Sequence, residues 1–372
     1  MSGFLTKAVL AAGFLLLAGC EIGPKDSAQT GYRGAGLDQI VDRSSVAKAA
    51  LIPAAAYPLP ADGGATAAAS YQNVPVLGGL SKDRFDHLMA QITQWVAPPE
   101  QGCNYCHNPA NLASDEKYQK VVARRMLQMT RTINSRWATH VKDTGVTCYT
   151  CHRGNAVPEY KWAVASAPGG ERTIRGNKRG QNSPDPNVGY ASLPSDPFAA
   201  YFEGNGEIRV ASNQALPSPN HKVSIKTAEK SYGLMMHISS ALGVNCTYCH
   251  NTQSFRAWNL SRAQRGTAYY GIRMVRDVND EYLTSLASVF PANRKGPHGD
   301  VLKVNCTTCH QGLSKPLGGV SMIAQAPALK GPGTASAAPE GGAGAGTAVP
   351  AAFNRPDAMT VKNEPAPTPA RK

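Results

Sequence analysis

The sequence predicts a mainly α-helical protein with long irregular loops, little β-strand and two similar halves. Helix-starting and helix-ending residues flank several amphipathic stretches, whereas strand signals are few and weak. With 36 glycines and 27 prolines among 372 residues, long loops are expected between the helices. After the first twenty residues no stretch is apolar enough to cross a bilayer, so a membrane-spanning bundle is not expected.

One motif, Cys-x-x-Cys-His, occurs four times and accounts for eight of the nine cysteines. Such a motif is typical of c-type haem attachment. Two thiols two residues apart can form thioethers to the vinyl groups of a haem, and the next residue then places an imidazole at the iron. We therefore predict four covalent haems, with attachment at Cys103, Cys106, Cys148, Cys151, Cys246, Cys249, Cys306 and Cys309 and proximal ligands His107, His152, His250 and His310.

Other uses of Cys-x-x-Cys are zinc binding and dithiol redox chemistry. Both are disfavoured because every one of the four copies also carries the histidine. A single copy of the motif could still bind zinc or act as a redox dithiol, but four copies favour haem attachment.

The ninth cysteine, Cys20, lies at the end of a leader. Lys7 precedes an apolar run from Ala8 to Ala18, which is too short to span a membrane. The sequence Leu17-Ala18-Gly19-Cys20 is similar to a bacterial lipoprotein signal, whose removal (residues 1–19) leaves Cys20 as a lipidated N-terminus. An ordinary secretory signal cut near Ala18 is the alternative, and in both cases the chain is exported.

The remaining chain divides by composition. Residues 20–74, rich in Ala, Gly and Pro, are expected to form an extended arm that runs from the anchor over the surface of another molecule. Residues 75–160 and 221–323 carry two haem motifs each, and 161–220 form a proline-rich connector that could hold short strands. The Ala-, Pro- and Gly-rich tail, 324–372, is expected to be disordered.

An internal repeat relates the two motif-bearing segments. Residues 88–93 match 234–239 before the first motif of each half, and residues 129–134 match 274–279 after it. Each half is therefore expected to consist of a helix, a haem motif, a longer helix and a second haem motif. Few apolar residues remain for an ordinary core, so we expect the haem faces to fill it and the fold to require them.

Local signals place the ends of four helices. Ser81 can begin the first, which Pro98 and Pro99 stop, and Ser114 with two acidic residues can begin a second that reaches about His140. In the second half, the corresponding helices are expected from about Thr227 to Gly243 and from Ser261 to before Pro291.

Candidates for the second axial ligands are the remaining Met and His residues, although a helical Met is by default core filler. Met89 and Met235 stand out because they are equivalent in the repeat. Met236 and His237 adjoin Met235, but each step along a helix turns a side chain by about 100°, so only one of the three can face the iron. The repeat favours Met235.

On the long helix, Met126, Met129 and His140 share one face if the helix is continuous. If Met129 were the ligand of the second haem, its repeat partner Met274 would serve the fourth and His140 would have no role. If Met126 is the ligand, its repeat partner is Gly271, which cannot bind a metal, and the fourth haem must borrow a ligand such as His140.

These residues, in this order and spacing over about residues 75–320, resemble the tetrahaem cytochrome subunit of the photosynthetic reaction centre of purple bacteria. The resemblance implies Met–His ligation at the first three haems through Met89, Met126 and Met235, and bis-His ligation of the fourth by His140 and His310. It also implies a lipid-anchored subunit on the periplasmic face of the photosynthetic membrane, with its haems in the spatial order one, two, four, three.

The function implied by this resemblance is electron transfer, not enzymatic turnover. The subunit would take electrons from a soluble cytochrome c or high-potential iron–sulfur protein and re-reduce the special pair held by the membrane subunits of the reaction centre. The alternatives are a lipoprotein cytochrome that serves another membrane complex, and a multihaem reductase, which would need an open iron. The formal charge of +13 does not indicate nucleic-acid binding, because haem propionates offset much of it.

Overall fold

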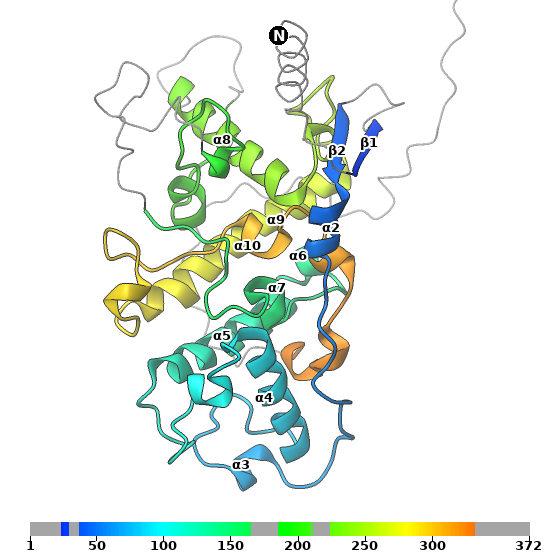
Figure 1. The fold of residues 1–372 in the computed structure, drawn as a ribbon. Helices are drawn as coiled ribbons and strands as arrows, with labels where there is room; N and C mark the ends of the chain where they lie inside the picture. The colour runs from blue at the N-terminus through cyan, green and yellow to red at the C-terminus, as the bar shows by residue number, and fades with distance from the viewer. Residues whose placement is uncertain (1–23, 30–36, 165–184, 209, 211–223, 332–372) are drawn as a thin grey trace, which may run out of the picture.

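Helices joined by irregular loops make up the computed structural model, which describes residues 24–29, 37–164, 185–208, 210 and 224–331 (Figure 1). The α-helices are α2 (Arg43–Ala49), α3 (Ala67–Ser70), α4 (Lys82–Val96), α5 (Tyr118–Arg136), α6 (Ala138–Val141), α7 (Cys148–His152), α8 (Ile225–Leu242), α9 (Ala263–Asp277) and α10 (Cys306–His310). Two antiparallel strands, β1 (Lys25–Gln29) and β2 (Asp38–Asp42), form the one sheet within the described residues. The predicted fold class, mainly helical with little strand, is confirmed.

Shorter helical turns connect these elements. The 3-10 turns are η2 (Gly102–Tyr105), η3 (Pro186–Val188), η5 (Cys246–Tyr248), η7 (Thr284–Leu286), η8 (Ala292–Arg294), η9 (Pro316–Gly319), η10 (Ile323–Gln325) and η11 (Pro327–Leu329). Two further turns, η4 (Ala199–Glu203) and η6 (Val278–Leu283), are π-helical. Because η6 and η7 follow α9 directly, the helical path of α9 continues as far as Leu286.

Helix ends with a strong local signal lie where the sequence predicts them. Helix α4 begins directly after Ser81 and ends at Val96, just before the two prolines. Helix α8 ends at Gly243, whose φ of 61° is left-handed, the conformation that glycine adopts without a Cβ penalty.

The prediction of one long helix from Ser114 to His140 is wrong at both ends. The Ser114 hydroxyl instead accepts from the Glu116 N–H in a local turn, and α5 begins only at Tyr118. At its other end α5 stops at Arg136, because Trp137 leaves the helical conformation (φ −104°, ψ 24°) before the short helix α6. His140 therefore belongs to α6, and the comparison of its direction with Met126 along one straight helix does not apply.

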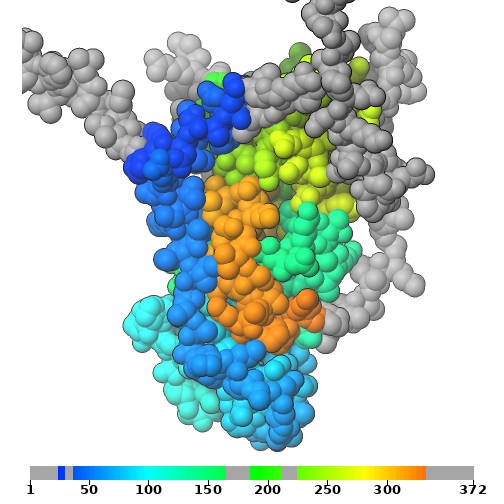
Figure 2. Space-filling view, turned by 90° about the vertical axis from the view of Figure 1, so that its right-hand side faces the viewer, coloured from blue at the N-terminus to red at the C-terminus, as the bar shows by residue number. Residues whose placement is uncertain are grey.

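The N-terminal arm differs from the expected extended segment over another molecule. It contains β1, β2, α2 and α3, and its irregular part follows the surface of this chain. Figures 1 and 2 show it descending beside the C-terminal segment towards α3 and α4. Side chains of α4 hold it by its backbone, because Arg84, His87 and Gln94 bond to the carbonyls of Pro60, Tyr57 and Ala54.

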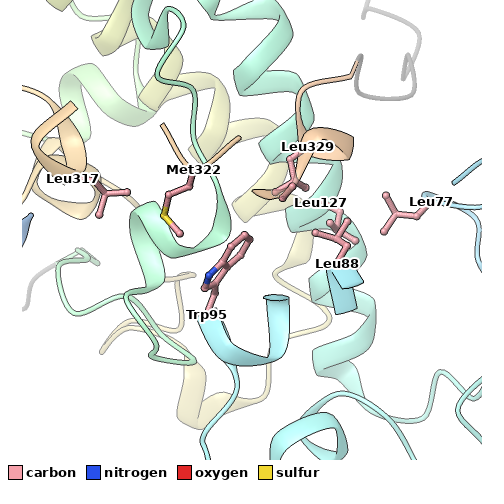
Figure 3. Packing of buried hydrophobic residues seen from close by; sticks show 8 residues of the cluster. Leu77, Leu88, Trp95, Leu127, Leu317, Met322 and Leu329 are labelled. Carbon is pink, nitrogen blue, oxygen red and sulfur yellow. The ribbon is translucent and has the colours of Figure 1, made fainter. Parts of the chain in front are cut away.

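Buried apolar residues form three separate clusters. The first lies between α4, α5 and the segment from η9 to η11, and Trp95 at its centre is fully buried (Figure 3). The second surrounds Phe198, Phe202 and Leu234, and the third joins the end of α5 to α9 and η6. The first and third clusters each contain residues of both motif-bearing segments, so apolar packing joins the two halves within the described part of the chain.

The boundary of the C-terminal tail lies later than predicted. Ala326 and Leu329 are buried in the first cluster, and the Leu329 carbonyl accepts from Asn134 Nδ2 at 2.9 Å. Packed apolar residues such as Ile323, Ala326 and Leu329 therefore extend the folded part beyond residue 323, although the composition there already resembles the tail. The leader, Cys20, the remainder of the tail and part of the connector lie outside the described residues.

Within the ranges that the structure describes, no helix is both long and apolar enough to cross a membrane. The connector, as far as it is described, contains η3 and η4 but none of the short strands that were allowed for it, only an isolated bridge between Trp162 and Lys303.

Candidate haem-binding sites

The second and fourth Cys-x-x-Cys-His motifs fold as single α-helical turns, α7 and α10. Each begins with a reciprocal capping box, between Thr147 and Thr150 in α7 and between Asn305 and Thr308 in α10. Each ends on a left-handed residue directly after the histidine, with φ of 51° at Arg153 and 49° at Gln311. The five motif residues are therefore held rigidly at both ends.

The first and third motifs share a different conformation. Their cysteines lie in or next to the 3-10 turns η2 and η5, each followed by a loop. His107 bonds to the carbonyl of Leu112 and His250 to that of Phe255, both five residues further on. The four motifs thus alternate along the chain between a 3-10 turn and an α-helical turn.

All four motif histidines, and His140 as well, hold their rings in the same way. In each the Nδ1 atom donates to a backbone carbonyl at 2.9 or 3.0 Å, the acceptors being Leu112, Asn155, Phe255, Leu313 and, for His140, Thr267. A carbonyl cannot donate, so the proton is on Nδ1 and the lone pair is on Nε2. This is the tautomer that binds a metal through Nε2.

Burial favours the neutral form of four of these imidazoles, those of His140, His152, His250 and His310. It lowers the pKa of His310 to about 4 and also lowers the pKa of His140, His152 and His250, because a buried ring loses the hydration that favours its charged form. At neutral pH their Nε2 lone pairs therefore remain free of protons.

Two asparagines, the half-buried Asn134 and the fully buried Asn279, fix the approach to the second and fourth motifs. Asn134 exchanges two hydrogen bonds with the backbone of Val146, at 2.7 and 2.9 Å. Asn279 does the same with Val304, at 2.9 and 3.1 Å. Each clamped valine lies two residues before the first cysteine of its motif, and the two asparagines are equivalent in the repeat. Sequence reasoning gave them no role, although each ends a matched repeat segment.

A second contact also recurs. The N–H group of Gly154 donates to the carbonyl of Trp95, and that of Gly312 to the carbonyl of Ala241, at 2.9 and 2.8 Å. Each donor lies two residues after a motif histidine, and each acceptor six residues after Met89 or Met235. Helices α4 and α8 thus support α7 and α10 in the same way.

The second and fourth motifs touch each other. Cys151 Sγ and Cys309 Sγ are 3.0 Å apart, although 158 residues separate them in the sequence. Each sulfur is the second thiol of its own motif, so groups attached to them would meet at this edge.

The rings of His140 and His310 lie at a spacing that suits one metal bound by both. Their ring centres are 6.1 Å apart, with the planes at 69°. A metal between two imidazoles places the ring centres about 6 Å apart, since each bond is about 2.0–2.1 Å and each ring centre lies about 1.1 Å behind its nitrogen. The residues present therefore fit a haem iron held by two histidines.

Met89 lies on the face of α4 that is turned to the first motif. Thr93, one turn further on, bonds to the Met89 carbonyl at 2.8 Å and lies 3.9 Å from Cys103 Sγ. Residues four apart share a helix face, so Met89 is placed beside that motif. Thr130 bonds in the same way to the carbonyl of Met126, at 2.9 Å.

The neighbours of Met235 are directed elsewhere. Met236 packs at Gly189, where a Cβ atom would lie 3.5 Å from its methyl carbon, and the ring of His237 stacks edge-on against Phe198 at 4.6 Å. Met274, the repeat partner of Met129, is a buried member of the third apolar cluster. Met236 and Met274 thus pack against other residues, as a methionine in a helix ordinarily does.

Sequence reasoning also missed Lys120. Its side chain is buried, and its ammonium group donates to the carbonyl of Leu112 at 2.7 Å, the same carbonyl that holds His107. Asp115 lies 3.4 Å from that ammonium group and accepts from Arg124 at 2.7 Å. A charged network thus supports the carbonyl that orients His107, the histidine of the first motif.

A zinc site finds little support in this arrangement. Among the residues that the structure describes, no group of three or more His, Cys, Asp or Glu side chains could hold a metal ion. Burial also raises the pKa of the Cys148 and Cys306 thiols to about 12, so without a bound group these thiols stay protonated at neutral pH.

Comparisons with known proteins agree on one family. The Photosynthetic reaction centre cytochrome C subunit family matches residues 21–330. The photosynthetic reaction center cytochrome c subunit of Rubrivivax gelatinosus is 52% identical over 336 residues, 90% of each chain. The subunit of the same name from Thermochromatium tepidum is 46% identical over 347 residues, 93% of this chain and 85% of the relative. Cytochrome c-554 of Chloroflexus aurantiacus is 26% identical over 67% of this chain.

Helical turns that present paired cysteines and an oriented histidine, in a fold with little other core, define a c-type cytochrome. More particularly, the chain belongs to the family of photosynthetic reaction centre cytochrome c subunits.

Proposed function

We propose that this protein is a membrane-anchored electron carrier with four c-type haems, which re-reduces the photo-oxidised special pair of the reaction centre. Its electrons come from a soluble periplasmic donor, a cytochrome c or a high-potential iron–sulfur protein. Family membership supports the reaction centre as partner. The observation that carries the proposal is that all four motif histidines offer Nε2 and fix Nδ1 in one common way.

In this proposal each motif attaches one haem through its two cysteines and ligates it through its histidine. Met89, Met126 and Met235 are the second ligands of the first three haems, and His140 is that of the fourth. The placement of Met89 beside Cys103, the different orientation of Met236 and His237, and the spacing of His140 and His310 support this assignment. With every iron bound on both sides, no position is open for a substrate, in line with electron transfer and not enzymatic turnover.

When bound, a haem supplies iron that cycles between the ferrous and ferric states. The chain sets the potential of each site through the second ligand. A methionine thioether favours the ferrous form and raises the potential, whereas a second imidazole lowers it. The proposed ligands thus give the fourth haem a lower midpoint potential than methionine ligation would give it.

The proposed spatial order of the sites is one, two, four, three. The short distance between Cys151 and Cys309 supports the middle step, because it brings the attachment edges of the second and fourth sites together. The paired Asn clamps and the paired glycine contacts support two dihaem halves, residues 75–160 and 221–323.

A light flash on native membranes tests the proposal. Haem absorbance should change to that of the oxidised form within milliseconds or faster after the flash, because only the photo-oxidised special pair creates the acceptor. Membranes that lack the reaction centre but contain the cytochrome serve as the control and should show no flash-induced change. Haems that remain reduced after the flash in untreated membranes would contradict a role in the reaction centre and favour another membrane complex.

The anchor is a separate part of the proposal. Cys20, in Leu17-Ala18-Gly19-Cys20, is proposed to carry the lipid that holds the protein at the periplasmic face of the membrane. Labelled fatty acid should appear in the natural protein and be absent from the Cys20→Ser variant, because the acyl chains attach at that sulfur. A natural protein without label would show that the leader is an ordinary secretory signal.

A further inference from the structure

Gly271, in the middle of α9, lies against the ring of His140. A Cβ atom at this position would be 2.5 Å from Cε1 of that ring, 2.9 Å from Nδ1 and 3.2 Å from Nε2. Real Cβ atoms essentially never approach another atom within 3.0 Å. Any side chain at 271 would therefore require the imidazole to move.

The imidazole has little freedom to move without losing its function. Its Nδ1 donates to the carbonyl of Thr267, which lies in α9 one turn before Gly271. The atom nearest to the added carbon, Cε1, lies between the two ring nitrogens, so its displacement shifts both of them. The bond to Thr267 would be strained, and the ring would lose its spacing from His310, which matches that of two imidazoles on a single metal.

The internal repeat shows which residue Gly271 replaces. In the first half the equivalent position is Met126, the proposed ligand of the second haem. In the second half the side chain is absent, and the ring of His140 from the other half fills the space. The exchange of methionine for glycine thus removes one ligand and makes room for another.

We propose that Gly271 is the positioning residue that selects bis-histidine ligation at the fourth haem. It acts through His140, by leaving α9 without a side chain where the imidazole must lie. This inference rests on the ligand assignment under the proposed function. It adds that one backbone position of α9 decides whether the fourth site receives an imidazole from the other half.

The test replaces Gly271 with alanine in the full haem-loaded protein. We expect loss of the electron paramagnetic resonance signal of the bis-histidine haem, appearance of a high-spin ferric signal, and a rise of one of the four midpoint potentials. Gly233→Ala is the matched control, because Gly233 is also a buried helical glycine, but its Cβ would meet no atom within 3.0 Å; the nearest are side-chain atoms of Val188 and Pro197, at 3.3 and 3.4 Å. Unchanged spectra and potentials in Gly271→Ala would overturn the proposal.

The variant His140→Ala separates this inference from the ligand assignment. If His140→Ala leaves the bis-histidine signal intact, the assignment itself is wrong and the inference falls with it. If His140→Ala removes the signal but Gly271→Ala does not, the inference alone is wrong. In the His140→Ala background, Gly271→Ala should have no further effect on the haem spectra, because the clash is gone.

The double variant also covers a failure to fold. Should Gly271→Ala alone yield no folded protein, recovery of folded protein by the added His140→Ala substitution would support a clash with the ring. A double variant that is equally unfolded would show that the glycine is needed for another reason, and would overturn the proposal.

Discussion

Single side chains explain much of how the sites are built, and part of this could be predicted from the sequence. The cysteines and proximal histidines follow from a motif of five residues, because thioether formation and ligation are local in the chain. The partners of their Nδ1 atoms are backbone carbonyls such as that of Thr267, which have no signature in the sequence. Lys120 was missed for the same reason, since it acts on the Leu112 carbonyl.

At Met126 the ligand assignment predicts a change of potential. Met126→His should convert the second haem to bis-histidine ligation and lower its midpoint potential, leaving the other three nearly unchanged. We expect a shift of more than about 59 mV, which is tenfold in the equilibrium of a one-electron step. Redox titration of the purified protein measures it, with Met129→His as the matched control. A larger shift from Met129→His would assign the second haem to Met129.

Asp115 predicts a dependence of stability on pH. The hydrogen bond from Arg124 lowers the pKa of this carboxyl below its ordinary value of 3.8. A carboxyl with a lowered pKa contributes stability above its unfolded pKa, and this contribution is lost as the pH falls through its folded pKa. Because the side chain is 43% exposed, we expect Asp115→Asn to cost no more than about 1 kcal/mol at pH 7.

Denaturant unfolding from pH 7 down to pH 3 measures this contribution. The difference in unfolding free energy between the natural protein and Asp115→Asn should be constant from pH 7 to about 5 and shrink below about pH 4. A difference that stays the same across the whole series would show that the charge of Asp115 has no part in it.

Elements differ in how far their bounds could be predicted. Helices α4 and α8 end at prolines or a glycine, which act locally, and the sequence predicts them correctly. The break between α5 and α6 falls at Trp137, which is neither proline nor glycine, so tertiary contacts determine it. The path of the arm depends on backbone carbonyls that accept from α4, and a composition rich in Ala and Pro does not disclose it.

The clamp between η6 and α10 predicts a loss of stability. Asn279 is fully buried and bonds to both backbone groups of Val304 and to the carbonyl of Phe202. Asn279→Ala leaves these groups without a partner, so we expect a loss of about 1–3 kcal/mol and a lower Tm. Asn134→Ala should cost a similar amount, and Asn293→Ala, at an exposed position of η8, almost nothing. Thermal unfolding by circular dichroism compares them, and equal Tm values for all three would refute the clamp.

For the whole molecule, the three small apolar clusters predict that folding depends on haem. They are separate within the described residues, and the turns α7 and α10 pack against two of them through Cys148 and Cys306. We expect the chain without attached haem to lack a cooperative thermal transition and to lose most of its helical signal in circular dichroism. Helical content equal to that of the haem-loaded protein, with a cooperative transition, would show that the apolar clusters suffice.

The pairing of His140 with His310 also determines the order in which the protein can be completed. The two rings meet at 6.1 Å, yet 170 positions separate them in the chain. During synthesis from the N-terminus, His140 is finished long before its partner, so the fourth site closes only after both halves have formed and met. The full-length variant His310→Ala should therefore leave His140 open to exogenous imidazole-binding metals, whereas the natural protein shields it. The fourth site is therefore complete only in protein whose two halves have both folded and come together.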